Sequence, residues 1–195
     1  MLCARCDGRW LEVGVGTGRF ASSLGVAEGI DPSPRMLAIS AGRGISTYTG
    51  CAESLPFPDE SFEGVLLALA ICFVAEPKQA VTQCHRVLRP QGRLLLGAIP
   101  ADSPWGREYG RKKASGHPVY AQARFLTTGE IVALMESAGF ALQDAASTLF
   151  WEPDGSPEDE PRVEAGIVPE AGFVGLLLRK TAGACARGDV REGRW

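Results

Sequence analysis

A glycine-rich segment near the start of the sequence has the composition of a ligand-binding loop. Residues 10–13, which are apolar apart from Glu12, predict a short strand, which runs directly into Gly14-Val15-Gly16-Thr17-Gly18 before a helical pattern over 19–24. Glycines let the backbone approach a ligand closely, and free N–H groups at a helix start favour an anionic group. The segment therefore predicts a cofactor-binding loop, with an ordinary tight turn as the alternative.

Two carboxylates flank this loop and help to define the cofactor. Glu12 lies two residues before Gly14, where it suits a cofactor with an ammonium group better than one with a pyrophosphate. Asp31 ends the next expected strand and could accept hydrogen bonds from both ribose hydroxyls of any nucleoside, or serve only as a helix cap. A dinucleotide fingerprint would require a glycine where Arg19 stands. The pattern therefore favours an amino-acid-bearing cofactor over a nicotinamide dinucleotide.

The elements that must position these residues follow an alternating pattern. Strand-like apolar runs alternate with helical patterns, which is typical of a mostly parallel sheet covered by helices. Strands are expected over 10–13, 27–30, 46–49, 62–69, 93–99, 141–151 and 173–178, and helices over 19–24, 36–41, 76–88 and 128–138. A turn is expected at 90–92, a solvated acidic loop at 152–164, and a polar substrate-facing insertion at 102–122.

Length and charge limit the class of partner. The 195 residues suffice for one α/β domain, expected over 1–180, with a disordered tail over 181–195. The formal net charge of −3 gives none of the basic character that dominates binding to nucleic acids or anionic membranes. The longest apolar stretch, Val65–Ala75, is shorter than the roughly 20 residues of a membrane span. We therefore expect a small-molecule partner, with neither nucleic acid nor membrane.

The cysteines point to neither disulfides nor a metal. The sequence lacks a secretory signal pattern, so the six cysteines do not suggest a disulfide framework, and a cytoplasmic location is expected. Cys3 and Cys6 have the spacing of a zinc knuckle, but a closed zinc site needs four ligands and the sequence offers no second pair. No metal site is therefore expected.

Four segments, in this order, resemble those of a known enzyme family. They are Leu11-Glu12-Val13-Gly14-Val15-Gly16-Thr17-Gly18, Gly29-Ile30-Asp31-Pro32-Ser33, Ala52-Glu53-Ser54-Leu55-Pro56-Phe57 and His85-Arg86-Val87-Leu88-Arg89-Pro90-Gln91-Gly92. Together they resemble class I S-adenosylmethionine-dependent methyltransferases of the ubiquinone/menaquinone-methyltransferase-like small-molecule group. The resemblance is strong from Trp10 to Gly97 and weaker to Leu178. It implies methyl transfer from S-adenosylmethionine to a small organic acceptor by direct in-line displacement.

The resemblance assigns the cofactor to a defined set of positions. They are Glu12, Gly14, Val15, Gly16, Thr17, Gly18, Asp31, Pro32, Met36, Cys51, Ala52, Glu53, Ala70 and Ile71. In this assignment Glu12 holds the methionine ammonium, Asp31 binds the ribose, and Glu53 faces the adenine edge beside the backbone of the preceding residue. Met36 packs on the adenine or ribose, or is only a helix core residue. Members often carry an aspartate where Cys51 stands, so Cys51 is expected to pack against the ring instead.

The resemblance also implies a Rossmann-like, doubly wound α/β sheet of seven strands, mostly parallel, with an antiparallel last strand beside the fifth. Members usually carry one or two helices before the first strand, which cover the cofactor, whereas only nine residues precede Trp10 here. The N-terminal cover helices are therefore expected to be missing. The alternatives are a truncated gene product, or a lid formed by the 102–122 insertion or by another subunit of a homo-oligomer. The alternative function is an S-adenosylmethionine-binding module without catalytic activity.

The sulfonium of the cofactor already activates the methyl group, so the protein must mainly position the acceptor and exclude water. If a general base is needed, His117 and Tyr109 of the polar insertion are the candidate catalytic residues. Glu108 and His85 also have suitable side chains, although His85 lies in an expected helix, where a surface or core position is favoured. Cys72 is expected to be a buried apolar residue, with thiol-dependent methylation of a soft acceptor such as arsenic as the alternative.

Overall fold

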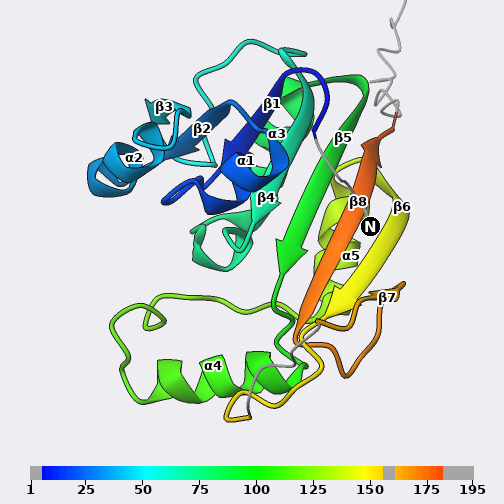
Figure 1. Cartoon of the computed structure of the whole chain (residues 1–195). Coiled ribbons are helices and arrows are strands. Elements are labelled where there is room, and N and C mark those ends of the chain that lie inside the picture. The colour runs from blue at the N-terminus through cyan, green and yellow to red at the C-terminus, as the bar shows by residue number, and fades with distance from the viewer. Residues whose placement is uncertain (1–5, 156–160, 182–195) are drawn as a thin grey trace, which may run out of the picture.

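The computed structural model describes residues 6–155 and 161–181, which form one mixed sheet with helices on both faces (Figure 1). The strands are β1 (Trp10–Val13), β2 (Glu28–Asp31), β3 (Ser46–Thr49), β4 (Phe62–Ala68), β5 (Leu88–Ala98), β6 (Phe140–Thr148), β7 (Glu164–Ala165) and β8 (Phe173–Lys180). The helices are α1 (Arg19–Leu24), α2 (Pro34–Ala41), α3 (Pro77–Val87), α4 (Pro104–Ala114) and α5 (Thr128–Ser137), with a short 3-10 helix, η1 (Ile71–Phe73).

The strand order β3-β2-β1-β4-β5-β8-β6-β7 makes the sheet doubly wound. The strands β1 to β5 pair in parallel, and β8 pairs antiparallel with both β5 and β6. The α/β class and the antiparallel last strand beside the fifth are therefore confirmed. Within the described residues the sheet has eight strands rather than the expected seven. The extra strand is β7, because Glu164 and Ala165 pair with β6 at the end of the segment expected to be only a solvated loop.

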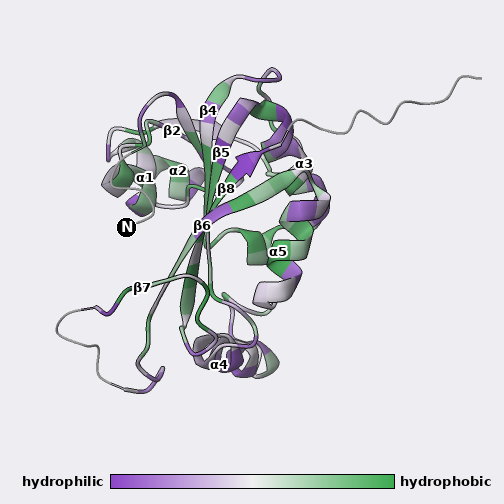
Figure 2. Ribbon diagram, turned by 90° about the vertical axis from the view of Figure 1, so that its right-hand side faces the viewer, coloured by the Kyte–Doolittle hydropathy of each residue, from purple (hydrophilic) through white to green (hydrophobic). Residues whose placement is uncertain are grey.

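The sheet lies between two helical layers. Figure 2 shows it edge-on, with α1 and α2 on one face and α3 and α5 on the other. On the face of α3 and α5, the buried side chains of Val81 and Ile131 belong to one core with Leu67 of β4. On the opposite face a second core contains Trp10 and Leu37. Because both faces are covered near β1 and β4, the residues of these central strands are apolar except for Glu12 and Glu63.

One expected turn lies inside a strand. The chain passes from α3 directly into β5 at Leu88, so residues 90–92, which were expected to turn the chain, lie within the bounds of this strand. Gln91 has a left-handed φ of 65°, and the pairing of β4 with β5 shifts register between Phe62 and Gly64. An irregularity of this kind accommodates the turn-forming residues without ending the strand.

The insertion at 102–122, expected to be polar and substrate-facing, contains α4, which lies beyond the carboxyl end of β5 in Figure 1. Ser103 caps this helix: its hydroxyl accepts a hydrogen bond from Gly106 N at 2.9 Å and donates one to Pro100 O at 2.7 Å. A Cβ on Gly106 would lie 1.8 Å from Pro100 O, so the first turn packs directly on the chain that leaves β5. The helix is mostly polar, and apolar periodicity therefore does not reveal it.

Some expectations concern residues outside the described ranges. The tail expected to be disordered lies there apart from Thr181, as do Cys3 and positions 156–160 of the acidic loop. Thr181 itself is held to the domain, because its N–H donates to Gly139 O at 2.9 Å. In the described part of the chain, no helix is long and apolar enough to cross a membrane. Within the same residues, no group of three or more His, Cys, Asp or Glu side chains could hold a metal ion.

Candidate functional site

A large cavity lies at the carboxyl ends of β1, β2 and β4. Its volume of about 680 Å³ is within the usual range for small-molecule sites. The strand order reverses between β1 and β4, so α1 leaves β1 on one face of the sheet while the chain after β4 continues to α3 on the other. In open α/β sheets ligands bind at this switch point.

The loop between β1 and α1 forms one wall of the cavity. Gly14, Gly16 and Gly18 all have left-handed φ values, of 74°, 51° and 74°. Gly14 N donates a hydrogen bond to Ile30 O at 2.8 Å, which holds the loop to β2. A Cβ on Gly14 would lie 2.5 Å from the Cβ of Ala70. Glycine at this position therefore permits both the backbone conformation and the close approach of the loop to the end of β4.

Glu12 is a buried carboxyl group in the lining of this cavity. Only 1% of its surface is exposed, and its Oε2 accepts a hydrogen bond from Ala21 N of α1 at 2.9 Å. Burial raises the pKa of Glu12 to about 8, with a contribution from the nearby charge of Asp31, while the bond from Ala21 opposes the shift. Burying a carboxylate is costly unless a cation pairs with it. An ammonium group placed beside Glu12 would therefore be stabilised, and would stabilise the ionised carboxylate in turn.

Asp31 ends β2 and is only partly buried. Its Oδ2 accepts a hydrogen bond from Gly16 N at 2.9 Å, and its Oδ1 accepts one from Ser33 N at 2.9 Å. A carboxylate has about four lone-pair positions, so each oxygen can accept a further hydrogen bond. Asp31 can therefore hold the glycine loop and bind two ligand hydroxyls at the same time.

The segments after β2 and β3 form another part of the lining. Pro32, Met36 and Cys51 all line the cavity, and Met36 is 42% exposed, so it is not a helix core residue. Glu53 also lines the cavity, but its Oε1 accepts a hydrogen bond from Ala75 N at 2.8 Å. The Glu53 side chain therefore holds the start of α3, which leaves the neighbouring backbone as the polar group for an adenine edge.

All the predicted cofactor positions line this cavity except Gly18 and Ile71. A Cβ on Gly18 would lie 2.5 Å from Ile45 Cδ1, so Gly18 lets α1 pack closely on its neighbours. Ile71 is buried and lines an adjacent cavity instead. Sequence reasoning missed Phe73 and Val119, which also line the large cavity. Phe73 follows the predicted positions after β4 and could have been found from them, whereas the fold of the insertion alone brings Val119 there.

A second cavity, of about 220 Å³, lies beside the first and shares Leu69, Phe73 and Val119 with it. Tyr109 of α4 lines this second cavity. Burial, with a smaller contribution from Tyr120, raises the pKa of Tyr109 to about 12. The phenol therefore remains protonated near neutral pH, so it can donate a hydrogen bond but is a poor general base.

His117, the other candidate base, does not line either of these two cavities. His117 is exposed, its Nδ1 accepts a hydrogen bond from Val119 N at 3.3 Å, and its ring centroid lies 5.0 Å from that of Tyr120. His117 therefore lies beside the second cavity, next to Val119 and Tyr120 of its lining. His85 packs edge-on against Phe140 between α3 and β6, in the surface or core position that was favoured for it.

Two further candidates have local structural partners. Glu108 forms ion pairs with Arg111 at 2.8 Å and Lys112 at 3.6 Å, as expected along an exposed helix face. Cys72 lines the second cavity, and burial raises the pKa of its thiol to about 11. The thiolate is therefore scarce at neutral pH, which disfavours thiol-dependent chemistry.

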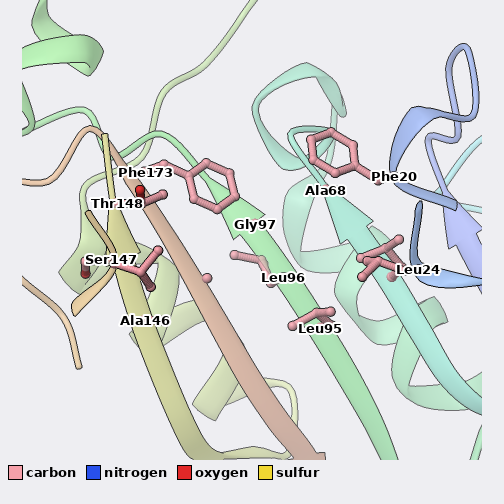
Figure 3. Close-up of a pocket in the computed structure, with 13 residues that line it drawn as sticks. Phe20, Leu24, Ala68, Leu95, Leu96, Gly97, Ala146, Ser147, Thr148 and Phe173 are labelled. Atoms are coloured by element: carbon pink, nitrogen blue, oxygen red, sulfur yellow. The ribbon is translucent and has the colours of Figure 1, made fainter. Parts of the chain in front are cut away.

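A third cavity, of about 240 Å³, lies on the sheet face that carries α1 (Figure 3). Phe20 and Leu24 of α1 lie on one side of it, and Phe173 of β8 lies on the other. A Cβ on Gly97 would lie 2.7 Å from Cζ of Phe173, so this ring covers the end of β5. Among the described residues that line the cavity, none has an ionisable side chain. A charged cofactor therefore fits the large cavity better than this apolar one.

Comparisons with known proteins connect this geometry to a family. The family described as Methyltransferase domain matches residues 11–96, which include the glycine loop, Asp31 and β4. A solved S-adenosylmethionine-dependent methyltransferase from Thermotoga maritima, described as a possible histamine N-methyltransferase, has 39% sequence identity and a TM-score of 0.84. That match covers 90% of this chain and 83% of the Thermotoga chain. The chain belongs to the S-adenosylmethionine-dependent methyltransferases.

Two curated relatives of this methyltransferase chain show how far the similarity extends. An uncharacterized protein of Mycobacterium tuberculosis is 37% identical over 166 residues, which are 85% of this chain and 58% of the relative. The chain thus spans little more than half the length of that relative. A demethylmenaquinone methyltransferase of Tropheryma whipplei is 38% identical over 94 residues, which are 44% of this chain and 39% of the relative. The similarity to the menaquinone group suggested by the sequence therefore covers part of the chain.

Membership of this family implies S-adenosylmethionine as the cofactor, and the residues of the large cavity fit it. The cofactor carries an ammonium group, a ribose diol and an adenine. The cavity offers the buried carboxyl of Glu12, the accessible carboxylate of Asp31, and the apolar surfaces of Pro32 and Met36. The methyltransferase therefore has one matching group for each part of the cofactor.

Proposed function

We propose that this chain transfers a methyl group from S-adenosylmethionine to a small organic acceptor, with the cofactor in the large cavity. The observation that carries the proposal is the placement of Glu12 and Asp31 on the two sides of a left-handed glycine loop. In the proposed complex Glu12 pairs with the methionine ammonium, and Asp31 accepts hydrogen bonds from the ribose. Pro32, Met36 and Cys51 pack on the adenosine. We also propose a single domain over 1–180 and a cytoplasmic location, as the sequence predicts.

The chemistry divides between cofactor and protein. When bound, the cofactor supplies a methyl group on a sulfonium, so an acceptor lone pair takes the methyl carbon while the electrons of the carbon–sulfur bond stay on sulfur. The protein orients the acceptor and excludes water. Tyr109 contributes as a hydrogen-bond donor rather than as a base, because its pKa is raised to about 12. For an acceptor that must lose a proton, we propose that His117, which lies outside the cavity linings beside Val119 and Tyr120, receives the proton through a water molecule and passes it to solvent.

Calorimetry tests cofactor choice directly. We expect saturable binding of S-adenosylmethionine and S-adenosylhomocysteine and no binding of NADH, because Arg19 occupies the third-glycine position of a dinucleotide loop. Folded protein that binds NADH, or that binds neither S-adenosyl compound, would refute the proposed cofactor site.

Turnover is tested with radiolabelled S-adenosylmethionine and a panel of carbon, oxygen and nitrogen acceptors. Histamine belongs in the panel because of the description of the Thermotoga relative. We expect methyl transfer to at least one small acceptor. Tight cofactor binding without transfer to any member of a broad panel would instead support the binding module without catalytic activity.

A further inference from the structure

The second cavity, beside the proposed cofactor site, has a predominantly apolar and aromatic lining. Tyr109, Tyr120 and Phe125 line it together with aliphatic side chains such as Ile99 and Leu126. Among the described residues of this lining, none is an acid, a histidine, a lysine or an arginine. The ionisable groups are only phenols and the thiol of a cysteine. The cavity therefore favours a ligand that has little charge of its own.

The aromatic rings of the lining form a compact cluster of three, in which the centroids of Tyr120 and Phe125 lie 6.2 Å apart with an angle of 48° between the ring planes. The centroids of Tyr109 and Tyr120 lie 4.7 Å apart, with an angle of 23° between the ring planes. The centroids of Tyr109 and Phe125 lie 5.9 Å apart, with an angle of 26°. Aromatic rings at such separations attract one another in offset-stacked geometry. A flat ligand could join these rings and gain the same kind of contact.

The environment of these rings penalises a charged ligand. Burial raises the pKa of Cys72 to about 11, and the raised pKa of Tyr109 has the same main cause. Lys112 Nζ lies 5.4 Å from the centroid of the Tyr109 ring, but Lys112 pairs with Glu108 and neither residue lines the cavity. An ion that entered would lose water without gaining a partner of opposite charge.

The second cavity shares part of its lining with the proposed cofactor cavity. Leu69 and Phe73 follow β4, Val119 belongs to the insertion, and all three line both cavities. Ala70, the residue after Leu69, lies close to the glycine loop, because a Cβ on Gly14 would lie 2.5 Å from the Cβ of Ala70. The two cavities thus meet near the methionine end of the proposed cofactor site.

We propose that the second cavity is the acceptor site and that the acceptor is a neutral, planar aromatic molecule. It packs against the cluster formed by Tyr109, Tyr120 and Phe125. A volume of about 220 Å³ limits the bound part to a small ring system. This inference rests on the proposed methyl transfer, because it names the class of the second substrate.

The test uses three matched probes with protein saturated by S-adenosylhomocysteine. They are 2-naphthol, its saturated analogue decahydro-2-naphthol, and the anionic naphthalene-2-sulfonate. Calorimetry is expected to show that 2-naphthol binds about fivefold or more tightly than either analogue, because it alone combines a flat aromatic face with neutrality. Equal or tighter binding of either analogue would overturn the proposal.

Substitutions then locate the probe. Tyr120→Leu should weaken 2-naphthol binding about fivefold to tenfold through loss of the stacked ring, whereas Tyr120→Phe should retain it. Phe125→Leu is a second variant in case the first does not fold. Tyr48→Leu is the matched control, since Tyr48 of β3 lines none of the three cavities. If Tyr48→Leu weakens binding as much as Tyr120→Leu, the probe is bound elsewhere and the proposal fails.

The two proposals fail in different ways. If S-adenosylhomocysteine binds but 2-naphthol does not, the aromatic acceptor site is wrong and the cofactor site stands. If S-adenosylhomocysteine does not bind to the folded protein, the proposed function itself is wrong. Tyr120→Leu is expected to leave the affinity for S-adenosylhomocysteine within about twofold, because Tyr120 does not line the large cavity.

Discussion

Glu12 and Asp31 both lie near the carboxyl ends of parallel strands beside the glycine loop, yet their surroundings give them different properties. Glu12 is buried and accepts a hydrogen bond from the backbone of Ala21. Asp31 is partly exposed and accepts hydrogen bonds from Gly16 N and Ser33 N. The sequence suggested a cofactor contact for both carboxylates, because their positions follow from strand ends. It could not show the difference in burial, which depends on how α1 packs over β1.

The raised pKa of Glu12 predicts proton release on cofactor binding. At pH 7 a carboxyl group with a pKa of about 8 is mostly protonated, and pairing with an ammonium lowers that pKa. Binding of S-adenosylhomocysteine should therefore release up to about one proton at pH 7, and its affinity should rise from pH 6 to 7.5. Calorimetry at pH 7 in two buffers with different ionisation enthalpies measures the number of protons released on binding.

Glu12→Gln is the variant that isolates this proton. It keeps the shape of the side chain but cannot ionise, so we expect weaker binding without the proton release of the native protein. Release of the same number of protons by the native protein and by Glu12→Gln would show that Glu12 is not the titrating group.

Asp31→Asn should weaken S-adenosylhomocysteine binding by about tenfold or more. An amide can accept fewer hydrogen bonds than a carboxylate, and bonds to a charged acceptor contribute about 1.5–3 kcal/mol. Asp144→Asn is the matched control, because Asp144 is exposed on β6 and lines none of the cavities. Calorimetry measures the affinity of both variants for S-adenosylhomocysteine. An unchanged affinity in Asp31→Asn would show that Asp31 does not bind the ligand.

At the scale of elements, local signals predicted more than signals that depend on distant contacts. The loop from Gly14 to Gly18 follows from its own sequence, and the expected ranges of β1 and α1 agree with the structure. The helix α4 was missed because its polar surface gives no apolar stripe, and its start depends on the packing of Gly106 against Pro100. Most of the second cavity was missed for the same reason, since Tyr109 and Tyr120 meet only once the insertion has folded.

Gly14→Ala and Gly16→Ala form a matched pair in the loop. Both residues have left-handed φ values, but a Cβ on Gly14 would lie 2.5 Å from Ala70 Cβ, whereas nothing lies within 4 Å of a Cβ on Gly16. We expect Gly16→Ala to lower the free energy of unfolding by about 1 kcal/mol, and Gly14→Ala by about 2–4 kcal/mol with a larger loss of cofactor affinity. If denaturant unfolding and calorimetry show that both variants lose the same stability and the same cofactor affinity, the close contact between Gly14 and Ala70 is contradicted.

The position of α4 can be tested in the same way. Gly106→Ala places a methyl group against the carbonyl of Pro100 and should lower the free energy of unfolding by about 2–3 kcal/mol, with weaker 2-naphthol binding because Tyr109 shifts. Gly129→Ala in α5, where a Cβ meets nothing within 4 Å, should be neutral or stabilising by up to about 1 kcal/mol. If thermal unfolding shows no difference between the two variants, α4 does not begin against Pro100.

For the whole molecule, the doubly wound sheet brings distant segments to one place. The large cavity is lined by residues from the β1–α1 loop, the ends of β2 and β3, the segment after β4, and the insertion at 102–122. Alternating patterns predicted the parallel part of the sheet, because each β–α unit is local. The insertion of β8 between β5 and β6 came only from family resemblance, since pairing between distant strands leaves no local pattern.

The central claim is that the large cavity holds S-adenosylmethionine between Glu12 and Asp31. A crystal structure of the protein with S-adenosylhomocysteine tests it most directly. We expect the amino group of the ligand within hydrogen-bonding reach of Glu12 and both ribose hydroxyls within reach of Asp31. Ligand density in the apolar cavity between Phe20 and Phe173, or in the large cavity with the ribose away from Asp31, would contradict it.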